Sequence, residues 1–195
     1  MTLRKWKMKK KQLFTLLATS ALACLALCAC GDKNEAKEPL SFADKNGSYT
    51  LIADDTWFDM SGQWNDEADI EIGNEKQEKY IIVLEENKED LAMNLEEYFT
   101  ITSGQFETIL TDMKETASGQ TEKNGMPAYY KEVEESVDKI NIHYWLYGVE
   151  GDQHFTQVIG WTLKSTIDKN RADIETVLKS FQPQTNPQTE PQSGK

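Results

Sequence analysis

Side chains that could bind a cation are concentrated in one stretch of the chain. The oxygen ligands of this stretch are Asn65, Asp66, Glu67, Asp69, Glu71 and Glu75. Residues 69–73 alternate acidic and apolar side chains, which predicts a strand with Asp69 and Glu71 on one face. The spacing is not that of an EF-hand loop, and a solvated charge run is the usual explanation. We therefore predict no metal site, with weak Ca²⁺ binding as the alternative.

Two tryptophans flank the polar loop of residues 59–69. Trp57 and Trp64 offer large ring faces that could contact a sugar or an apolar group of a partner. Together with Asp66, Asp69 and Glu71 they form the candidate ligand-binding set of this sequence. Burial in the core is the competing interpretation, and it is the commoner fate of aromatic side chains.

The remaining candidates for chemistry do not form a catalytic pattern. His143 lies in a predicted strand and His154 beside a turn, about 10 Å or more apart, so we expect two unconnected surface or edge histidines that cannot share a zinc ion. Glu132, Glu134 and Glu135 are neighbours on one strand, and the first two are expected to face solvent, whereas a glycosidase pair must flank a cleft. Nucleophile-elbow, P-loop and dinucleotide motifs are absent. We expect no enzymatic activity and no cofactor.

One cysteine stands in a sequence that fits lipid attachment. Cys30 follows Leu27, Cys28 and Ala29 and precedes Gly31, which resembles the lipobox of bacterial lipoproteins. The resemblance implies transfer of diacylglycerol to the Cys30 thiol and cleavage between Ala29 and Cys30. A plain secretory signal with incidental cysteines is the alternative.

The residues before this cysteine support export. Residues 1–12 carry six basic side chains and no acid. Residues 13–29 are almost wholly apolar or small, and this stretch is shorter than the about 20 residues of a typical membrane-spanning helix. Two or three acyl chains, palmitate among them, hold a protein stably on a membrane. We therefore expect a protein anchored on the outer face of the cytoplasmic membrane through Cys30.

The charge of the mature chain limits its partners. Removal of residues 1–29 takes away six of 21 basic residues and none of 33 acids, which leaves 15 minus 33, or −18. Such a surface repels nucleic acid, so we expect no nucleic-acid partner. No cysteine follows Cys30, which excludes disulfides and thiol sites from the folded part.

The remaining sequence predicts one domain with mixed secondary structure. Strands are expected at 49–52, 69–73 and 80–84, followed by a helix that begins with an Asn94–Glu97 capping box and stops at Gly104, and then by a second helical stretch from Phe106 to Met113. After a turn at Asn124, strands are expected at 128–137, 140–147 and 155–163, and Asp168 is expected to cap a last helix. Large apolar residues on both faces of the 140–163 hairpin predict cover on both sides of the sheet.

The order of these motifs resembles the PsbP-like α/β/α sandwich superfamily, specifically the small lipoproteins of Gram-positive bacteria that carry such a domain. The matching segments are 48–52 leading to Trp57, 94–98, 124–128 and 177–181, while a proline common before the tryptophan is replaced by residues 54–56. The resemblance implies an α+β fold, an antiparallel β-sheet with helices packed on both faces, and an extracytoplasmic accessory or binding module without shared catalytic residues.

The predicted organisation is a cleaved signal peptide over 1–29, a flexible spacer over 30–46, the PsbP-like domain over 47–182 and a disordered Pro/Gln/Thr tail over 183–195. The expected function is a non-enzymatic binding or accessory module for a membrane or cell-wall protein. A solute- or cation-binding lipoprotein that uses residues 65–75 with Trp57 and Trp64 is the alternative.

Overall fold

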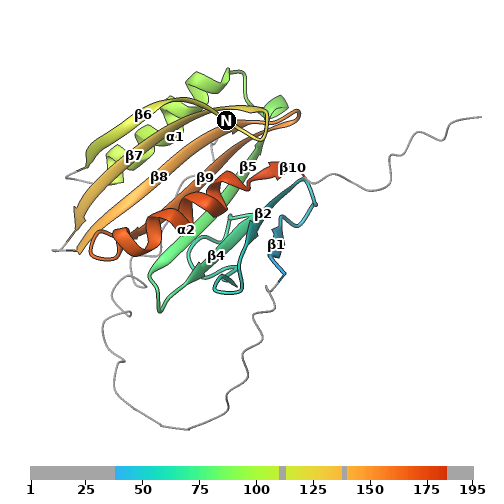
Figure 1. The fold of residues 1–195 in the computed structure, drawn as a ribbon. Helices are drawn as coiled ribbons and strands as arrows, with labels where there is room; N and C mark the ends of the chain where they lie inside the picture. The colour runs from blue at the N-terminus through green and yellow to red at the C-terminus, as the bar shows by residue number, and fades with distance from the viewer. Residues whose placement is uncertain (1–37, 110–112, 138–139, 184–195) are drawn as a thin grey trace, which may run out of the picture.

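The computed structural model describes residues 38–109, 113–137 and 140–183, which contain two antiparallel sheets and two long helices (Figure 1). The larger sheet has seven strands, in the spatial order β3 (Phe58–Asp59), β4 (Ile70–Asn74), β5 (Lys79–Asn87), β9 (His154–Leu163), β8 (Ile140–Glu150), β7 (Met126–Val137) and β6 (Lys114–Lys123). The smaller sheet consists of β1 (Leu40–Ala43), β2 (Tyr49–Ala53) and β10 (Gln182–Pro183). A 3₁₀ turn (Lys88–Asp90) follows β5.

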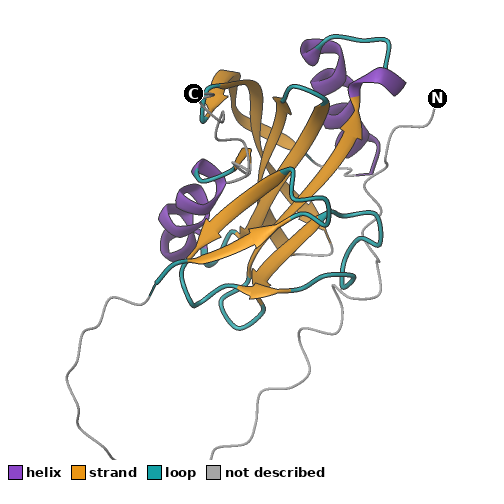
Figure 2. Cartoon of the chain, turned by 90° about the vertical axis from the view of Figure 1, so that its right-hand side faces the viewer, coloured by secondary structure: helices purple, strands orange, loops and turns teal. Residues whose placement is uncertain are grey.

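The helices α1 (Leu95–Ile109) and α2 (Ile167–Lys179) lie on opposite sides of the large sheet (Figure 2). One core cluster packs under α2 and the small sheet, and includes Leu51, Trp145 and Ile174. The other packs under α1 and includes Phe99 and Tyr144. Both faces of the sheet are therefore covered, which confirms the predicted α+β architecture with helices on both faces. No helix in the described ranges is long and apolar enough to span a membrane.

Alternation along β8 explains how one strand serves two cores. Ile142, Tyr144 and Leu146 belong to the α1-side core, whereas Trp145 and Val149 belong to the α2-side core. Successive side chains of a strand point to opposite faces, so this continuous apolar run requires cover on both sides. The hairpin to β9 forms as predicted, with Glu150 paired to Phe155.

The start of α1 forms as its sequence predicts. The Asn94 side chain accepts a hydrogen bond from the Glu97 amide at 3.0 Å, and the Glu97 carboxylate accepts one from the Asn94 amide at 3.0 Å. This capping box satisfies amides that have no partner inside the helix. The predicted stop at Gly104 is wrong, because a single helix continues to Ile109 and buries Phe106 at 2% exposure. Burial of an aromatic ring outweighs the cost of about 1 kcal/mol for a glycine inside a helix.

Other boundaries also differ from the prediction. Strand β1 lies inside the range predicted as a spacer, because Leu40–Ala43 pairs with β2 and Phe42 packs against the α2-side core. Helix α2 begins after Thr166, so Asp168 lies in the first turn rather than at the cap. The remaining spacer residues up to 37, the Ala29 and Cys30 cleavage and lipidation site, and tail residues 184–195 lie outside the described residues.

Strand β6 was not predicted. Its sequence, KETASGQTEK, contains alanine as its only apolar residue, so it shows no hydrophobic alternation. It forms because β7 offers a complete hydrogen-bonding edge, with pairing from Lys114 opposite Glu134 to Lys123 opposite Met126. It is also the last strand of the large sheet.

Candidate functional site

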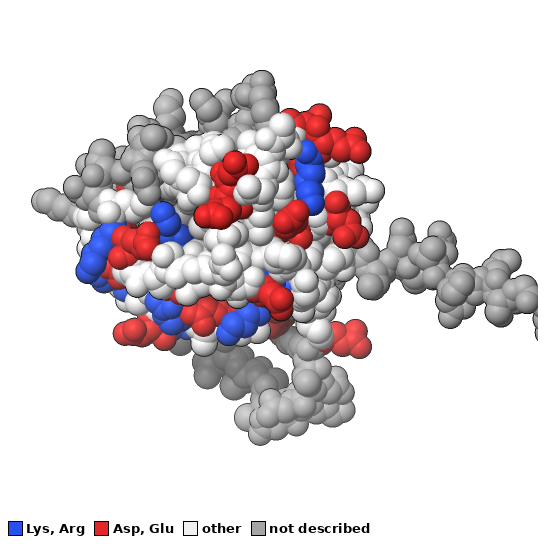
Figure 3. Space-filling model, turned by 90° about the horizontal axis from the view of Figure 1, so that it is seen from above, with Lys and Arg blue, Asp and Glu red and all other residues white. Residues whose placement is uncertain are grey.

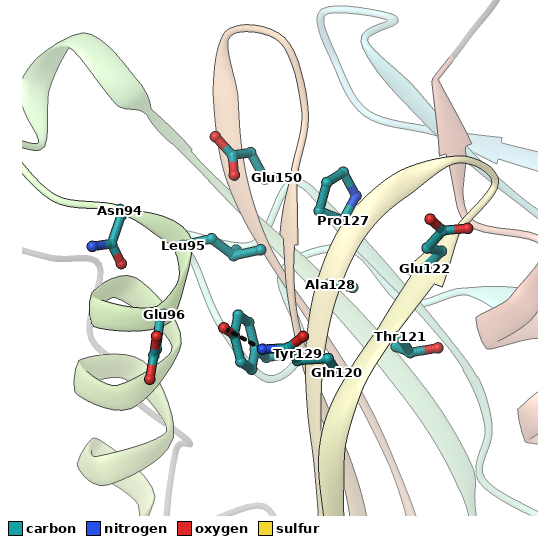
Figure 4. Close-up of a pocket in the computed structure, with 10 residues that line it drawn as sticks. All are labelled: Asn94, Leu95, Glu96, Gln120, Thr121, Glu122, Pro127, Ala128, Tyr129 and Glu150. Carbon is teal, nitrogen blue, oxygen red and sulfur yellow. Dashed lines mark hydrogen bonds between the residues drawn. The ribbon is translucent and has the colours of Figure 1, made fainter.

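An open groove of about 640 Å³ lies between the start of α1 and the β6–β7 hairpin (Figure 4). A second hollow of about 410 Å³ continues along α1 and shares Gln120 and Tyr129 with the first. We call the two together the α1–β6 groove. Helix α1 contributes Leu95, Glu96, Phe99 and Ser103, and β6 contributes Ser118, Gln120 and Glu122.

The floor of the α1–β6 groove is aromatic and fixed by contacts. The Tyr129 ring stacks on Phe99, with centroids 6.0 Å apart, and its hydroxyl accepts a hydrogen bond of 2.9 Å from the Gln120 amide group. Phe99 itself packs over Gly148, where an added Cβ would lie 2.9 Å from the ring. The absence of a side chain at Gly148 therefore lets α1 approach the sheet closely enough to form one wall of the groove.

The charged side chains of the larger hollow are all acidic. Glu96, Glu122 and Glu150 line it, and the first two are solvent-exposed. Glu150 is paired with Lys88 at 2.5 Å. In the continuing hollow Glu115 and Lys131 form an ion pair at 3.4 Å. Figure 3 shows acidic side chains spread over the face seen from above, with most basic ones nearer its left and lower edges.

The two tryptophans of the predicted ligand set are buried. Trp57 is 1% exposed, and its indole N–H donates to Asp173 of α2 at 3.2 Å. Trp64 is 8% exposed and packs edge-on against Tyr80 and Trp161, 4.5 and 5.6 Å between centroids. Neither ring presents a free face to a ligand, so the packing interpretation holds. The polar loop folds back over the sheet because Trp64 closes the α1-side core.

The acidic residues of the predicted set are also engaged in the fold. Glu71 is 1% exposed and accepts hydrogen bonds from the backbone amides of residues 63, 64 and 65. Asp69 accepts one from the Glu85 amide at 2.7 Å, while Asp66 stays exposed. In the described ranges no three His, Cys, Asp or Glu side chains converge to hold a metal ion. Glu71 thus organises the loop, a role that alternation alone does not reveal.

The expectation of surface histidines is wrong for His143, which is 2% exposed under α2. Its ring packs against Trp145, and its Nε2 lies 3.1 Å from Glu132 and 3.4 Å from Arg171. Burial first, and then the Arg171 charge, lowers the His143 pKa, which favours the neutral ring. This cluster lies on the α2 face, opposite the α1–β6 groove. Glu132 and Glu134 are half-buried, not open to solvent as predicted.

The burial of a third carboxylate on β7, that of Glu135, was not predicted from the sequence. Glu135 is 3% exposed on the α1 side of β7, where its carboxyl group lies beside the buried hydroxyl group of Tyr144. Burial raises its pKa to about 7, with the neighbouring Tyr144 opposing the shift. The alternation of β7 carried a signal, because Val133 and Glu135 share the face opposite Glu132 and Glu134.

Comparison with known proteins identifies the fold. No protein-family model and no curated protein matches the chain. Among solved structures, cyanobacterial PsbP (CyanoP) from Synechocystis sp. PCC 6803 aligns with a TM-score of 0.53 and 14% identity over 80% of this chain and 98% of that one. The fold is PsbP-like. LpqN of Mycobacterium tuberculosis, described as involved in cell envelope biogenesis, aligns with a TM-score of 0.58 and 9% identity over 76% of this chain and 91% of LpqN. A Pseudomonas aeruginosa protein of unknown function, a putative regulator, aligns at 0.50 and 10% identity over 77% and 100%.

Proposed function

We propose that this protein is a lipoprotein, anchored through Cys30 to the outer face of the cytoplasmic membrane, whose PsbP-like domain binds a membrane or cell-wall protein as a non-enzymatic accessory module. The observation that carries the binding role is the open α1–β6 groove, which joins aromatic floor residues to an acidic rim. The description of LpqN as an envelope-biogenesis protein agrees with a role at the cell surface.

The chemistry of the groove supports binding rather than catalysis. Its lining combines amide, hydroxyl, aromatic and carboxylate groups, and the described histidines do not line it. His143 lies on the opposite face of the sheet, enclosed between Trp145 and Arg171. A general base must reach the proton that it abstracts, and this imidazole faces protein on both sides.

The test is cross-linking on intact cells, followed by affinity recovery and mass spectrometry. We expect one membrane or wall protein in near-stoichiometric yield with the wild-type chain. The Cys30→Ala variant should leave the membrane fraction and lose or reduce that partner, because the tether no longer concentrates the domain at the membrane. Wild-type chain that is well expressed and membrane-bound, yet recovers no partner, would refute the accessory role.

A further inference from the structure

We propose that strand β6 accepts an extended, lysine- or arginine-bearing polypeptide segment as an eighth strand of the large sheet, with the basic side chains entering the α1–β6 groove. This inference rests on the proposed function and specifies the part of the partner that is bound. Pairing of an extended segment with an exposed sheet edge is a general mode of peptide recognition, in which backbone hydrogen bonds give affinity and pockets give specificity.

The register shows which backbone groups of β6 point outward. Asn124 and Gly125 form a two-residue hairpin turn, with φ of 47° and 82°. In such a turn the two flanking residues, Lys123 and Met126, form the first hydrogen-bonded pair of the hairpin. Hydrogen-bonded pairs then alternate along the ladder, so the N–H and C=O groups of Ser118, Gln120 and Glu122 point away from β7.

No described strand pairs with this outer edge of β6. Natural sheets commonly block an exposed edge with a bulge, a proline or an inward-pointing lysine. In β6 the irregularity lies between Glu115 and Ala117, and the two lysines stand at the strand ends. The five residues 118–122 between them are regular and contain neither lysine nor proline.

The side chains beside this edge select the chemistry of the incoming segment. Ser118, Gln120 and Glu122 share the face of Tyr129 and therefore border the α1–β6 groove. A strand docked on β6 would direct alternate side chains into the same groove. There the exposed carboxylates of Glu96 and Glu122 complement a positive charge, and the Tyr129 ring can cover the aliphatic part of a lysine or arginine side chain.

The nearby helix end does not favour an anion instead. The N-terminus of α1 carries a partial positive charge, but Glu96 and Glu97 lie in its first turn and the capping box occupies amides there. The larger hollow has three carboxylates and no basic lining residue. A second copy of this acidic chain is the competing occupant of the edge, and sedimentation of the wild type and of Gln120→Pro distinguishes it from a basic peptide.

The experiment uses the purified membrane-extracted protein and a nine-residue probe peptide that alternates lysine and valine, with both ends blocked. Binding is followed by fluorescence anisotropy. One control peptide carries glutamate in place of lysine, and the other carries a methyl group on every backbone amide nitrogen. We expect both controls to bind at least about tenfold more weakly, because one removes the charge complementarity and the other removes the backbone donors.

Two matched variants isolate the edge. Gln120→Pro removes an N–H that points outward and leaves the β6–β7 ladder complete, whereas Gln120→Ala removes only the side chain. We expect Gln120→Pro to weaken probe binding about tenfold relative to Gln120→Ala. Equal affinity of these two variants would overturn the inference. Thermal unfolding of both checks that the fold is intact, and an Ile101→Ala variant on the exposed side of α1 serves as an additional surface reference.

The charge requirement is tested separately. The Glu96→Gln/Glu122→Gln double variant should weaken probe binding about fivefold or more, and Glu67→Gln, an exposed acid of the distant loop, should leave it unchanged. Equal loss in both would attribute binding to the overall acidic charge and overturn the site. A wild-type dimer in sedimentation that Gln120→Pro dissociates would assign the edge to a second copy and also overturn it.

Photocross-linkers in cells separate failure of this inference from failure of the proposed function. One is placed at Gln120 on β6, and the other at Phe58 on β3, the opposite edge of the sheet. A partner captured at Phe58 alone would retain the accessory role and reject the β6 site. A partner captured at Gln120 through a basic segment supports both proposals, and no partner at either position argues against both.

Discussion

Neutralising the buried carboxylate of Glu135 should make the protein more stable at alkaline pH. The pKa of this side chain is about 7 in the folded protein, against 4.5 for an ordinary glutamate. Between these values the folded state holds a proton that the unfolded chain has released, so the contribution of Glu135 to stability is greatest below pH 4.5, falls as the pH rises and levels off above pH 7. The full shift corresponds to about 3 kcal/mol.

The perturbation is Glu135→Gln, which keeps the shape of the neutral carboxyl and cannot ionise. The free energy of unfolding should differ little between variant and wild type at pH 4, whereas at pH 8 the variant should be more stable by about 3 kcal/mol. For a domain of this size that difference raises the melting temperature by about 10 °C. Urea titrations at several pH values from 4 to 8 measure it directly.

The control lies next to Glu135 on the opposite face of the strand. The hydrogen bond from Lys164 lowers the pKa of Glu134, so this carboxylate stabilises the protein above its unfolded pKa and that stability is lost as the pH falls. Glu134→Gln should therefore lower stability at neutral pH, by up to about 1 kcal/mol for a partly exposed pair. Parallel pH profiles for wild type and Glu135→Gln would refute the assignment of a buried, protonated Glu135.

Three further predictions follow from the packing. The lowered pKa of His143 means that its contribution to stability is complete above pH 6.5 and falls below it, where the unfolded chain takes up a proton first. The free energy of unfolding of His143→Gln should therefore rise relative to that of the wild type as the pH is lowered from 7 to 5, measured by urea titration. Gly148→Ala should lower stability by about 1–3 kcal/mol and displace α1, measurable as faster amide exchange around Phe99. Glu71→Gln should cost about 1–3 kcal/mol and shift Trp64 fluorescence, because loop amides lose their charged acceptor; unchanged stability would contradict that role.

The strongest local patterns were read correctly from the sequence. The Asn94 capping box and the β8–β9 hairpin form where predicted, because both depend on residues close together in the chain. The apolar residues on both faces of β8 predicted cover on both sides of the sheet, which α1 and α2 provide. Local hydrogen bonds and period-two alternation contain enough information for these features.

Features that depend on distant partners were missed. Strand β6 has no apolar pattern and exists because β7 provides a hydrogen-bonding edge. Helix α1 passes Gly104 because Phe106 is buried against the sheet. In each case a tertiary contact outweighs a local preference of about 1 kcal/mol.

By itself the sequence determined the composition of this protein, the capping box of α1, the β8–β9 hairpin and the lipobox that predicts attachment at Cys30, since these features are properties of short segments. Only the tertiary structure decided which of the candidate site residues are buried and which surfaces stay open. It buried Trp57 and Trp64, used Glu71 as a loop acceptor, enclosed His143 under α2 and left β6 beside an open groove. Burial and free edges are set by what packs against a residue from elsewhere in the chain.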